Sequence, residues 1–124
     1  MKSIFLKKMG SSTRNKIMDF LITFSDFDYS LKEISKNSNT GYSTVKIIIK
    51  KMLEDDWLIL TRKISKIKLY KLNRDNIEVE KFIDFYWAVI ENELQKSPEF
   101  KEKYKKTNLI KIKSKKNLKN TITV

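Results

Sequence analysis

The stretch "GYSTVKIIIKKML", residues 41–53, decides the fold. It begins with small and polar residues and continues with apolar residues that recur at the spacing of one helical face. That face comprises Val45, Ile48, Ile49, Met52 and Leu53. The spacing predicts an amphipathic helix over 42–55, with its apolar stripe in the core and its lysines outside. The neighbouring sequence must show what the polar face contacts.

Two further helices are predicted before this one. Residues 11–24 begin with a serine N-cap, Ser11 or Ser12, and repeat apolar residues at helical spacing. Residues 30–36 are predicted as a shorter helix, because Ser30 and Glu33 have the S-x-x-E spacing of a capping box. Asn39 follows it and tolerates the left-handed conformation of a tight turn. The predicted order is therefore helix, short helix, turn and helix.

A basic β-hairpin is predicted after the third helix. Residues 57–62 and 67–72 are rich in strand-forming residues, and a short basic connection joins them. No acidic residue occurs between positions 57 and 74. The sequence thus predicts a mainly α fold with a small hairpin wing, an α+β arrangement.

The fourth predicted helix, over 77–95, is apolar on nearly all sides, so that it must bury more than one face. One face would cover the preceding domain, and a second copy of the chain is the economical partner for the other. The predicted dimer interface comprises Phe82, Phe85, Tyr86, Trp87, Val89 and Ile90. An alternative is that the C-terminal tail covers this helix. The predicted domains are an N-terminal arm (1–10), the winged domain (11–76), the dimerisation helix (77–95) and a basic tail (96–124), expected to be flexible.

The charge of the chain indicates a polyanionic partner. The 27 basic and 15 acidic residues give a formal net charge of +12. Ten lysines and two glutamates in residues 96–124 give that segment a net charge of +8. The chain has no cysteine and no histidine, which excludes thiolate metal sites, zinc–imidazole chemistry and Ser-His catalysis by this chain alone. The sequence predicts no enzyme, no metal and no cofactor.

The sequence resembles the small winged helix-turn-helix DNA-binding proteins of archaea, including those of archaeal plasmids and viruses. The resemblance rests on "MGSSTRNKIMDFL" (9–21), "DYSLKEISKNSNTGYSTVKIIIKKMLEDDWL" (28–58) and "TRKISKIKLYKLN" (61–73), in this order. It implies that the third helix enters the major groove of double-stranded DNA. It also implies that the wing lies on the adjacent backbone or minor groove.

Carried onto this sequence, the resemblance gives two sets of DNA-contacting residues. In the recognition helix they are Tyr42, Ser43, Thr44, Lys46, Ile47 and Lys50. In the wing they are Arg62, Lys63, Ser65, Lys66 and Lys68. Proteins of this kind often carry Arg or Gln where Ile47 stands. Since isoleucine offers only an apolar surface, for instance to a thymine methyl group, strong readout of a G·C pair is not expected from it.

These observations favour a dimeric transcription regulator. Two other functions remain open at this point. One is a sequence-tolerant DNA-coating protein, such as a plasmid-partition or chromatin protein, which the basic tail would suit. The other is a winged-helix adaptor that binds proteins instead of DNA. No apolar run approaches the roughly 18 residues of a membrane-spanning helix, and the expected location is the cytoplasm, in association with the nucleoid.

Overall fold

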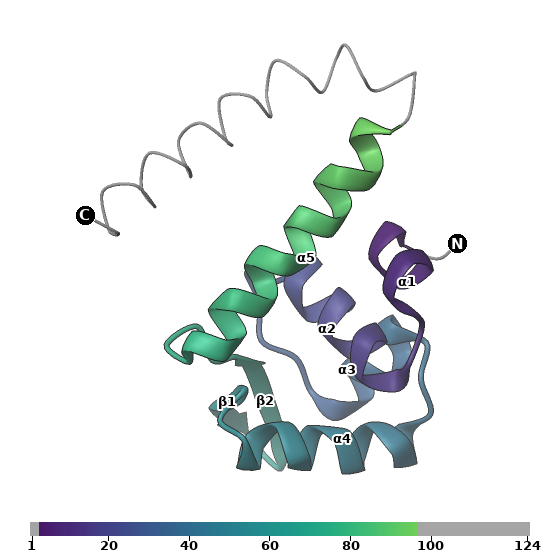
Figure 1. Cartoon of the computed structure of the whole chain (residues 1–124). Coiled ribbons are helices and arrows are strands. Elements are labelled where there is room, and N and C mark those ends of the chain that lie inside the picture. The colour runs from purple at the N-terminus through teal and green to yellow at the C-terminus, as the bar shows by residue number, and fades with distance from the viewer. Residues whose placement is uncertain (1–2, 97–124) are drawn as a thin grey trace, which may run out of the picture. The chain divides into compact units, whose positions relative to one another are not determined.

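The computed structural model describes residues 3–96 of the chain. The described residues form five helices and one two-stranded sheet (Figure 1). In order they are α1 (Ile4–Met9), α2 (Thr13–Thr23), α3 (Leu31–Ser38), α4 (Tyr42–Glu54), β1 (Leu58–Ile64), β2 (Ile67–Leu72) and α5 (Ile77–Gln95). The first of two compact units ends at Tyr86, within α5, and the second begins at Trp87. The predicted basic tail beyond Lys96 lies outside the described residues.

Local capping signals set the ends of α2 and α3. The side chain of Ser12 accepts a hydrogen bond of 3.2 Å from the amide of Asn15 at the start of α2. The capping box of α3 is complete, because Ser30 and Glu33 each accept a hydrogen bond from the other's amide. Asn39 ends α3 in the left-handed region, with φ 54° and ψ 51°. All three features were predicted from the sequence, and the structure confirms them.

The apolar stripe of α4 lies in the core. Val45, Ile49 and Met52 are fully buried, and Ile48 and Leu53 are half-buried. α4 packs against α2, α3 and β1. The other fully buried residues of these helices are Ile17 and Met18 of α2 and Ile34 of α3. Burial of this stripe fixes which side of α4 faces outward.

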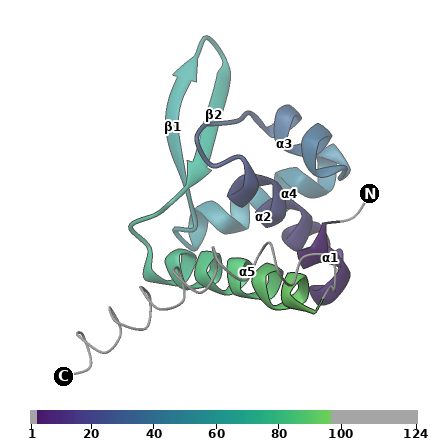
Figure 2. The ribbon, with the colours of Figure 1, turned by 90° about the horizontal axis from the view of Figure 1, so that it is seen from above.

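The residues of the hairpin are buried at its base and exposed towards its tip, and Figure 2 shows the hairpin projecting away from the helices. The strands are antiparallel, with Leu58 opposite Leu72 near the base and Ile64 opposite Ile67 at the tip. A two-residue turn joins them, and Ser65, its first residue, has a positive φ of 57°. The register shifts between Leu60 and Arg62, so that Thr61 forms a β-bulge.

The structure corrects the prediction that residues 1–10 form an arm. Residues 4–9 form α1, whose Phe5 is 1% exposed and lies with its ring centroid 4.7 Å from that of Tyr86. Ser3 caps this helix and also donates a hydrogen bond of 2.8 Å to Asp19 of α2. The N-cap serine before an apolar run and Gly10 after it, with φ 96°, are helix signals that the prediction did not use.

The first half of α5 belongs to the core of the first unit, where two residues of the predicted dimer interface, Tyr86 and Phe82, make contacts within their own chain. Tyr86 is 2% exposed, and its hydroxyl donates a hydrogen bond of 2.7 Å to Asp19. Burial raises the pKa of the Tyr86 phenol to about 12. Phe82 is half-buried, with its ring 5.9 Å from that of Phe5 and 5.6 Å from that of Trp57. Both residues are therefore occupied within their own chain.

Candidate nucleic-acid interface

The outward face of α4 carries all six residues predicted for the recognition helix. Ile47 is 70% exposed, although the side chains of Val45 and Ile49, two residues to either side of it, are buried. The remaining members are also exposed: Tyr42, Ser43, Thr44, Lys46 and Lys50. Lys46 and Lys50 are one helical turn apart and lie on the same side of the helix. The surface is thus basic along its length, with one apolar side chain beside the lysines.

The start of α4 is open to an anion. Its N-cap is Gly41, which makes no side-chain capping hydrogen bond, and the first turn contains no acidic residue. The first amides of a helix have no partner within the helix and carry its positive dipole end. These amides therefore complement the lysines that follow them, because both favour phosphate.

A groove connects α4 with the wing. Its volume is about 270 Å³. It is lined by Ser30, Leu31, Lys32, Tyr42, Lys66, Ile67, Lys68 and Tyr70. The groove brings two predicted wing residues, Lys66 and Lys68, to the start of the recognition helix. It also adds Lys32, which the sequence did not single out, because Lys32 belongs to the capped helix α3 and to neither predicted contact element.

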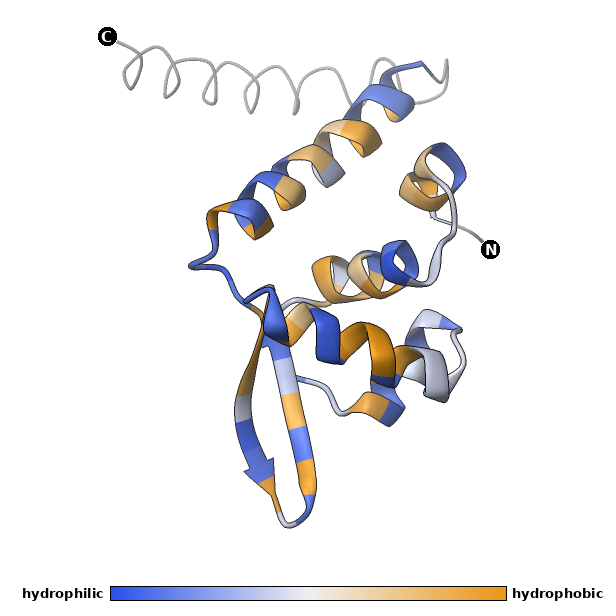
Figure 3. Ribbon diagram, turned by 60° about the horizontal axis from the view of Figure 1, so that its bottom comes forward, coloured by the Kyte–Doolittle hydropathy of each residue, from blue (hydrophilic) through white to orange (hydrophobic). Residues whose placement is uncertain are grey.

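Along β2, lysines alternate with apolar residues, whereas β1 runs from apolar residues at its base to Arg62 and Lys63 near the tip, as the colours of Figure 3 show. Lys63, Ser65, Lys66 and Lys68, all predicted DNA contacts, are exposed. Ile64 and Ile67, which face each other across the strands, are also exposed. Such a hairpin presents positive charge that can contact a phosphate backbone, and it also presents exposed apolar side chains near its tip.

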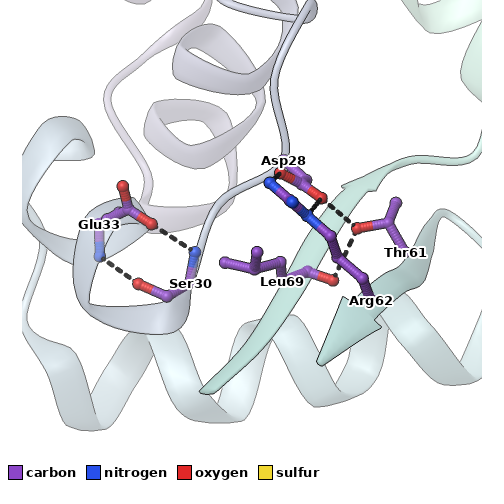
Figure 4. Close-up of polar contacts among 6 residues, drawn as sticks. All are labelled: Asp28, Ser30, Glu33, Thr61, Arg62 and Leu69. Atoms are coloured by element: carbon purple, nitrogen blue, oxygen red, sulfur yellow. Dashed lines mark hydrogen bonds and ion pairs between the residues drawn. The ribbon is translucent and has the colours of Figure 1, made fainter. Parts of the chain in front are cut away.

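Arg62, the fifth predicted wing residue, is already engaged by a carboxylate (Figure 4). Its Nε and Nη2 donate hydrogen bonds of 2.9 and 3.1 Å to the two carboxylate oxygens of Asp28. The Thr61 hydroxyl lies 2.6 Å from the same carboxylate. The hydrogen bond from Arg62, followed by that from Thr61, lowers the pKa of Asp28 from 3.8 to about 2. Asp28 is separated from the wing by more than 30 residues, so no local pattern pointed to this pair.

The chemistry of this face is that of a binding surface. Within residues 3–96 the structure contains no group of three or more side chains able to hold a metal ion. None of the helices in that range is long and apolar enough to span a membrane. The groups that do converge are lysines, hydroxyls and helix amides, the usual partners of phosphate oxygens in protein–DNA complexes.

No known protein family matches the sequence, and no curated protein matches it either. Similarity appears at the level of structure. The chain is similar to MepR, a transcription regulator of the Staphylococcus aureus multidrug efflux pump MepA, with a TM-score of 0.54, 16% identity, and coverage of 84% of this chain and 78% of MepR.

Two other solved structures show the same similarity. A protein of unknown function from Listeria innocua has a TM-score of 0.55 and 18% identity, with coverage of 90% of this chain and 78% of that one. Mb0332 from Mycobacterium bovis, a homodimeric winged helix-turn-helix DNA-binding domain and possible ArsR-family regulator, has a TM-score of 0.53 and 13% identity, with coverage of 77% and 82%. At these identities the similarity concerns the fold, and the chain has the winged helix-turn-helix fold.

Proposed function

We propose that this protein is a homodimeric transcription regulator that binds double-stranded DNA. α4 enters the major groove, and the wing contacts the adjacent backbone or minor groove. The observation that carries the proposal is the groove in which the start of α4 meets Lys66 and Lys68 of the wing. It supports the proposal because Tyr42, the first residue of the recognition helix, lies beside two lysines of the wing. The protein would act in the cytoplasm, at the nucleoid, and its similarity to archaeal plasmid and viral proteins remains a prediction.

Sequence readout is assigned to the start and middle of α4. A B-DNA major groove admits one helix, and its base edges differ in their donors, acceptors and methyl groups. Ser43 and Thr44 have short side chains that allow close approach and hydrogen bonding to base edges. Ile47 projects 70% exposed and suits contact with a thymine methyl group. Lys46, Lys50 and the wing lysines are assigned to phosphates, which fix position without reading sequence.

The dimer is assigned to exposed apolar side chains of α5. Phe85 is 45% exposed and Trp87 is 40% exposed in the single chain, whereas Val89 is buried and Ile90 half-buried. Burying the part of each side chain that is still exposed, a little under half, against a second copy contributes roughly 1 kcal/mol each. A two-fold axis would place two recognition helices about 10 base pairs apart on an inverted repeat. Mb0332, which shares the fold, is homodimeric.

Footprinting on DNA upstream of the protein's own gene, over a protein concentration series, tests the proposal. A regulator gives discrete protected sites that do not spread as concentration rises. A DNA-coating protein gives an extending footprint. An adaptor gives no salt-dependent DNA affinity at all. For about four to six neutralised phosphates per protomer, each protomer should contribute roughly −4 to −5 to the slope of log affinity against log salt concentration.

Sedimentation of Trp87→Glu tests the dimer separately. We expect monomers that bind a half-site only, because the charge cannot be buried in an apolar helix pair. Phe27→Glu is the matched control, since Phe27 is an exposed aromatic residue outside α5. Wild-type protein that sediments as a monomer at tens of micromolar would contradict the proposed dimer. DNA binding by α4 and the wing would then still be tested by the footprinting experiment.

A further inference from the structure

Asp28 lies where the wing meets the helical part of the first unit (Figure 4). Both of its carboxylate oxygens accept hydrogen bonds from Arg62 of β1, at 2.9 and 3.1 Å. The Thr61 hydroxyl lies 2.6 Å from Oδ2 of Asp28 and 3.1 Å from the carbonyl oxygen of Leu69 on β2. One carboxylate thus contacts two consecutive residues of the wing, in the bidentate geometry that gives an Arg–carboxylate pair directional specificity.

The β-bulge makes this arrangement possible. In a regular strand consecutive side chains point to opposite faces, so Thr61 and Arg62 would not reach one carboxylate. The register shift between Leu60 and Arg62 leaves Thr61 as an extra residue and re-aims the side chains. A bulge also bends and twists its strand. The contact with Asp28 therefore occurs at the residue where the wing changes direction.

The two residues after Asp28 attach it to the helix-turn-helix. Tyr29 exchanges backbone hydrogen bonds of 2.9 and 2.8 Å with Tyr70 of β2. Ser30 begins the capping box with Glu33 that starts α3. Three consecutive residues thus contact the bulge of β1, the backbone of β2 and the first turn of α3. α3 in turn packs against α4.

We propose that Asp28 is a positioning residue that fixes the direction of the wing relative to α4, so that both contact the same stretch of DNA. The inference rests on the proposed DNA binding and deepens it. Asp28 itself has no favourable contact to offer a polyanion, because its charge repels phosphate. Its role runs through Arg62 and Thr61, whereas Lys63, Lys66 and Lys68 further along the wing carry the phosphate contacts.

The sign of the effect of Asp28→Asn on DNA affinity tests this role. Removing an acidic charge next to a DNA-binding surface should by charge alone raise the affinity. If Asp28 positions the wing, Asp28→Asn lowers the affinity severalfold in spite of the charge gain. Asp26→Asn is the matched control, since Asp26 is an exposed acid two residues earlier and its removal changes the charge equally. It should leave the affinity unchanged or slightly raised.

A measurement without DNA separates this inference from the proposed function. The chain has no cysteine, so spin labels at Lys36→Cys on α3 and Lys66→Cys at the wing tip report one distance. Asp28→Asn should broaden or shift the distribution of this distance, and Asp26→Asn should not. If wild-type protein does not bind DNA, the proposed function fails, while the label distance still decides whether Asp28 holds the wing.

A double-mutant cycle tells positioning from direct contact by Arg62. If Arg62 acts through Asp28, then Asp28→Asn, Arg62→Gln and the double variant weaken DNA binding to a similar extent. Additive losses, with Arg62→Gln the larger, would instead show Arg62 on a phosphate. Additive losses in this cycle would overturn the inference. It would also be overturned if Asp28→Asn left the distance between the two spin labels unchanged and left the DNA affinity unchanged or raised.

Discussion

The outer face of α4 and the wing are both basic and exposed, but they are held in place by different means. α4 is fixed by its own buried stripe, with Val45, Ile49 and Met52 in the core. The wing is exposed from Ile59 to Lys68 and has no core of its own along that length. Its attachments lie at the base, in the buried ends of its strands and in the contact of its bulge with Asp28.

This difference separates two ways in which a surface is positioned. A helix with one apolar stripe presents its opposite side to solvent as soon as the stripe is buried. A hairpin that projects from the core has no such stripe along its length, and its direction depends on the buried residues at its base and on a few polar contacts there. Substitutions in the core should therefore act on α4 through stability, whereas substitutions at the base of the wing should act through geometry.

The largest expected effect follows from breaking the attachment of α4. Ile49→Ala should lower the free energy of unfolding by about 2–5 kcal/mol, because it removes buried methyl groups and leaves a cavity. Ile47→Ala, two residues earlier on the exposed side, should change it by no more than about 0.5 kcal/mol. Chemical denaturation of both variants measures the difference. Equal losses would mean that Ile47 also packs in the core.

The next effect concerns the charge on α4. Replacing Lys46 and Lys50 by Ala should weaken DNA binding and flatten the salt dependence, lowering the magnitude of its slope by about 1.8 for each bound protomer, which loses two phosphate contacts. Lys36→Ala is the control, since Lys36 is exposed on α3 outside the groove. Binding titrations at several salt concentrations measure the slope. An unchanged slope in the double variant would remove α4 from the phosphate contacts.

A smaller effect should distinguish residues that read the base sequence from residues that only hold the protein on the DNA backbone. Ile47→Ala should alter base preference at one or two positions of the site by roughly 1 kcal/mol. Lys63→Ala on the wing should lower affinity for all sequences about equally. Selection from a randomised DNA library compares the two variants. If only the wing variant changes preference, the roles assigned to α4 and the wing must be exchanged.

The smallest effect is a pH dependence confined to the wing. The folded-state pKa of Asp28 lies below its ordinary value, at about 2, so its ionised contact with Arg62 is complete above pH 4 and is lost as pH falls towards 2. Amide chemical shifts of Thr61 and Arg62 should move in that window, and Asp28→Asn should abolish the movement. Movement centred near pH 4 would mean that the ion pair does not form in solution.

The sequence predicted the helices, and it predicted α4 best, for a physical reason. Ser30, Glu33 and Asn39 act on their own neighbours, and the α4 stripe repeats along one helix, so each signal is local. α1 was missed although its local signals, Ser3 before it and Gly10 after it, were present, and only its packing of Phe5 against Tyr86 depends on residues distant in sequence. The contact of Asp28 with the wing was not predicted, since its partners lie in another element. Because α5 is apolar on nearly all sides, the sequence analysis also assigned Tyr86 to the dimer interface, although its hydroxyl donates a hydrogen bond to Asp19 within the same chain.

The exposed side of α4 has a consequence for how such a protein changes over evolutionary time. Ser43, Thr44, Ile47 and Lys50 project from a helix that the opposite side alone holds in the core. Exchanges at these positions cost little folding free energy, because surface substitutions usually stay within about 0.5 kcal/mol. A lineage can thus try new side chains there one at a time without passing through unfolded intermediates. Target preference is free to drift on this face while the scaffold beneath it stays constant.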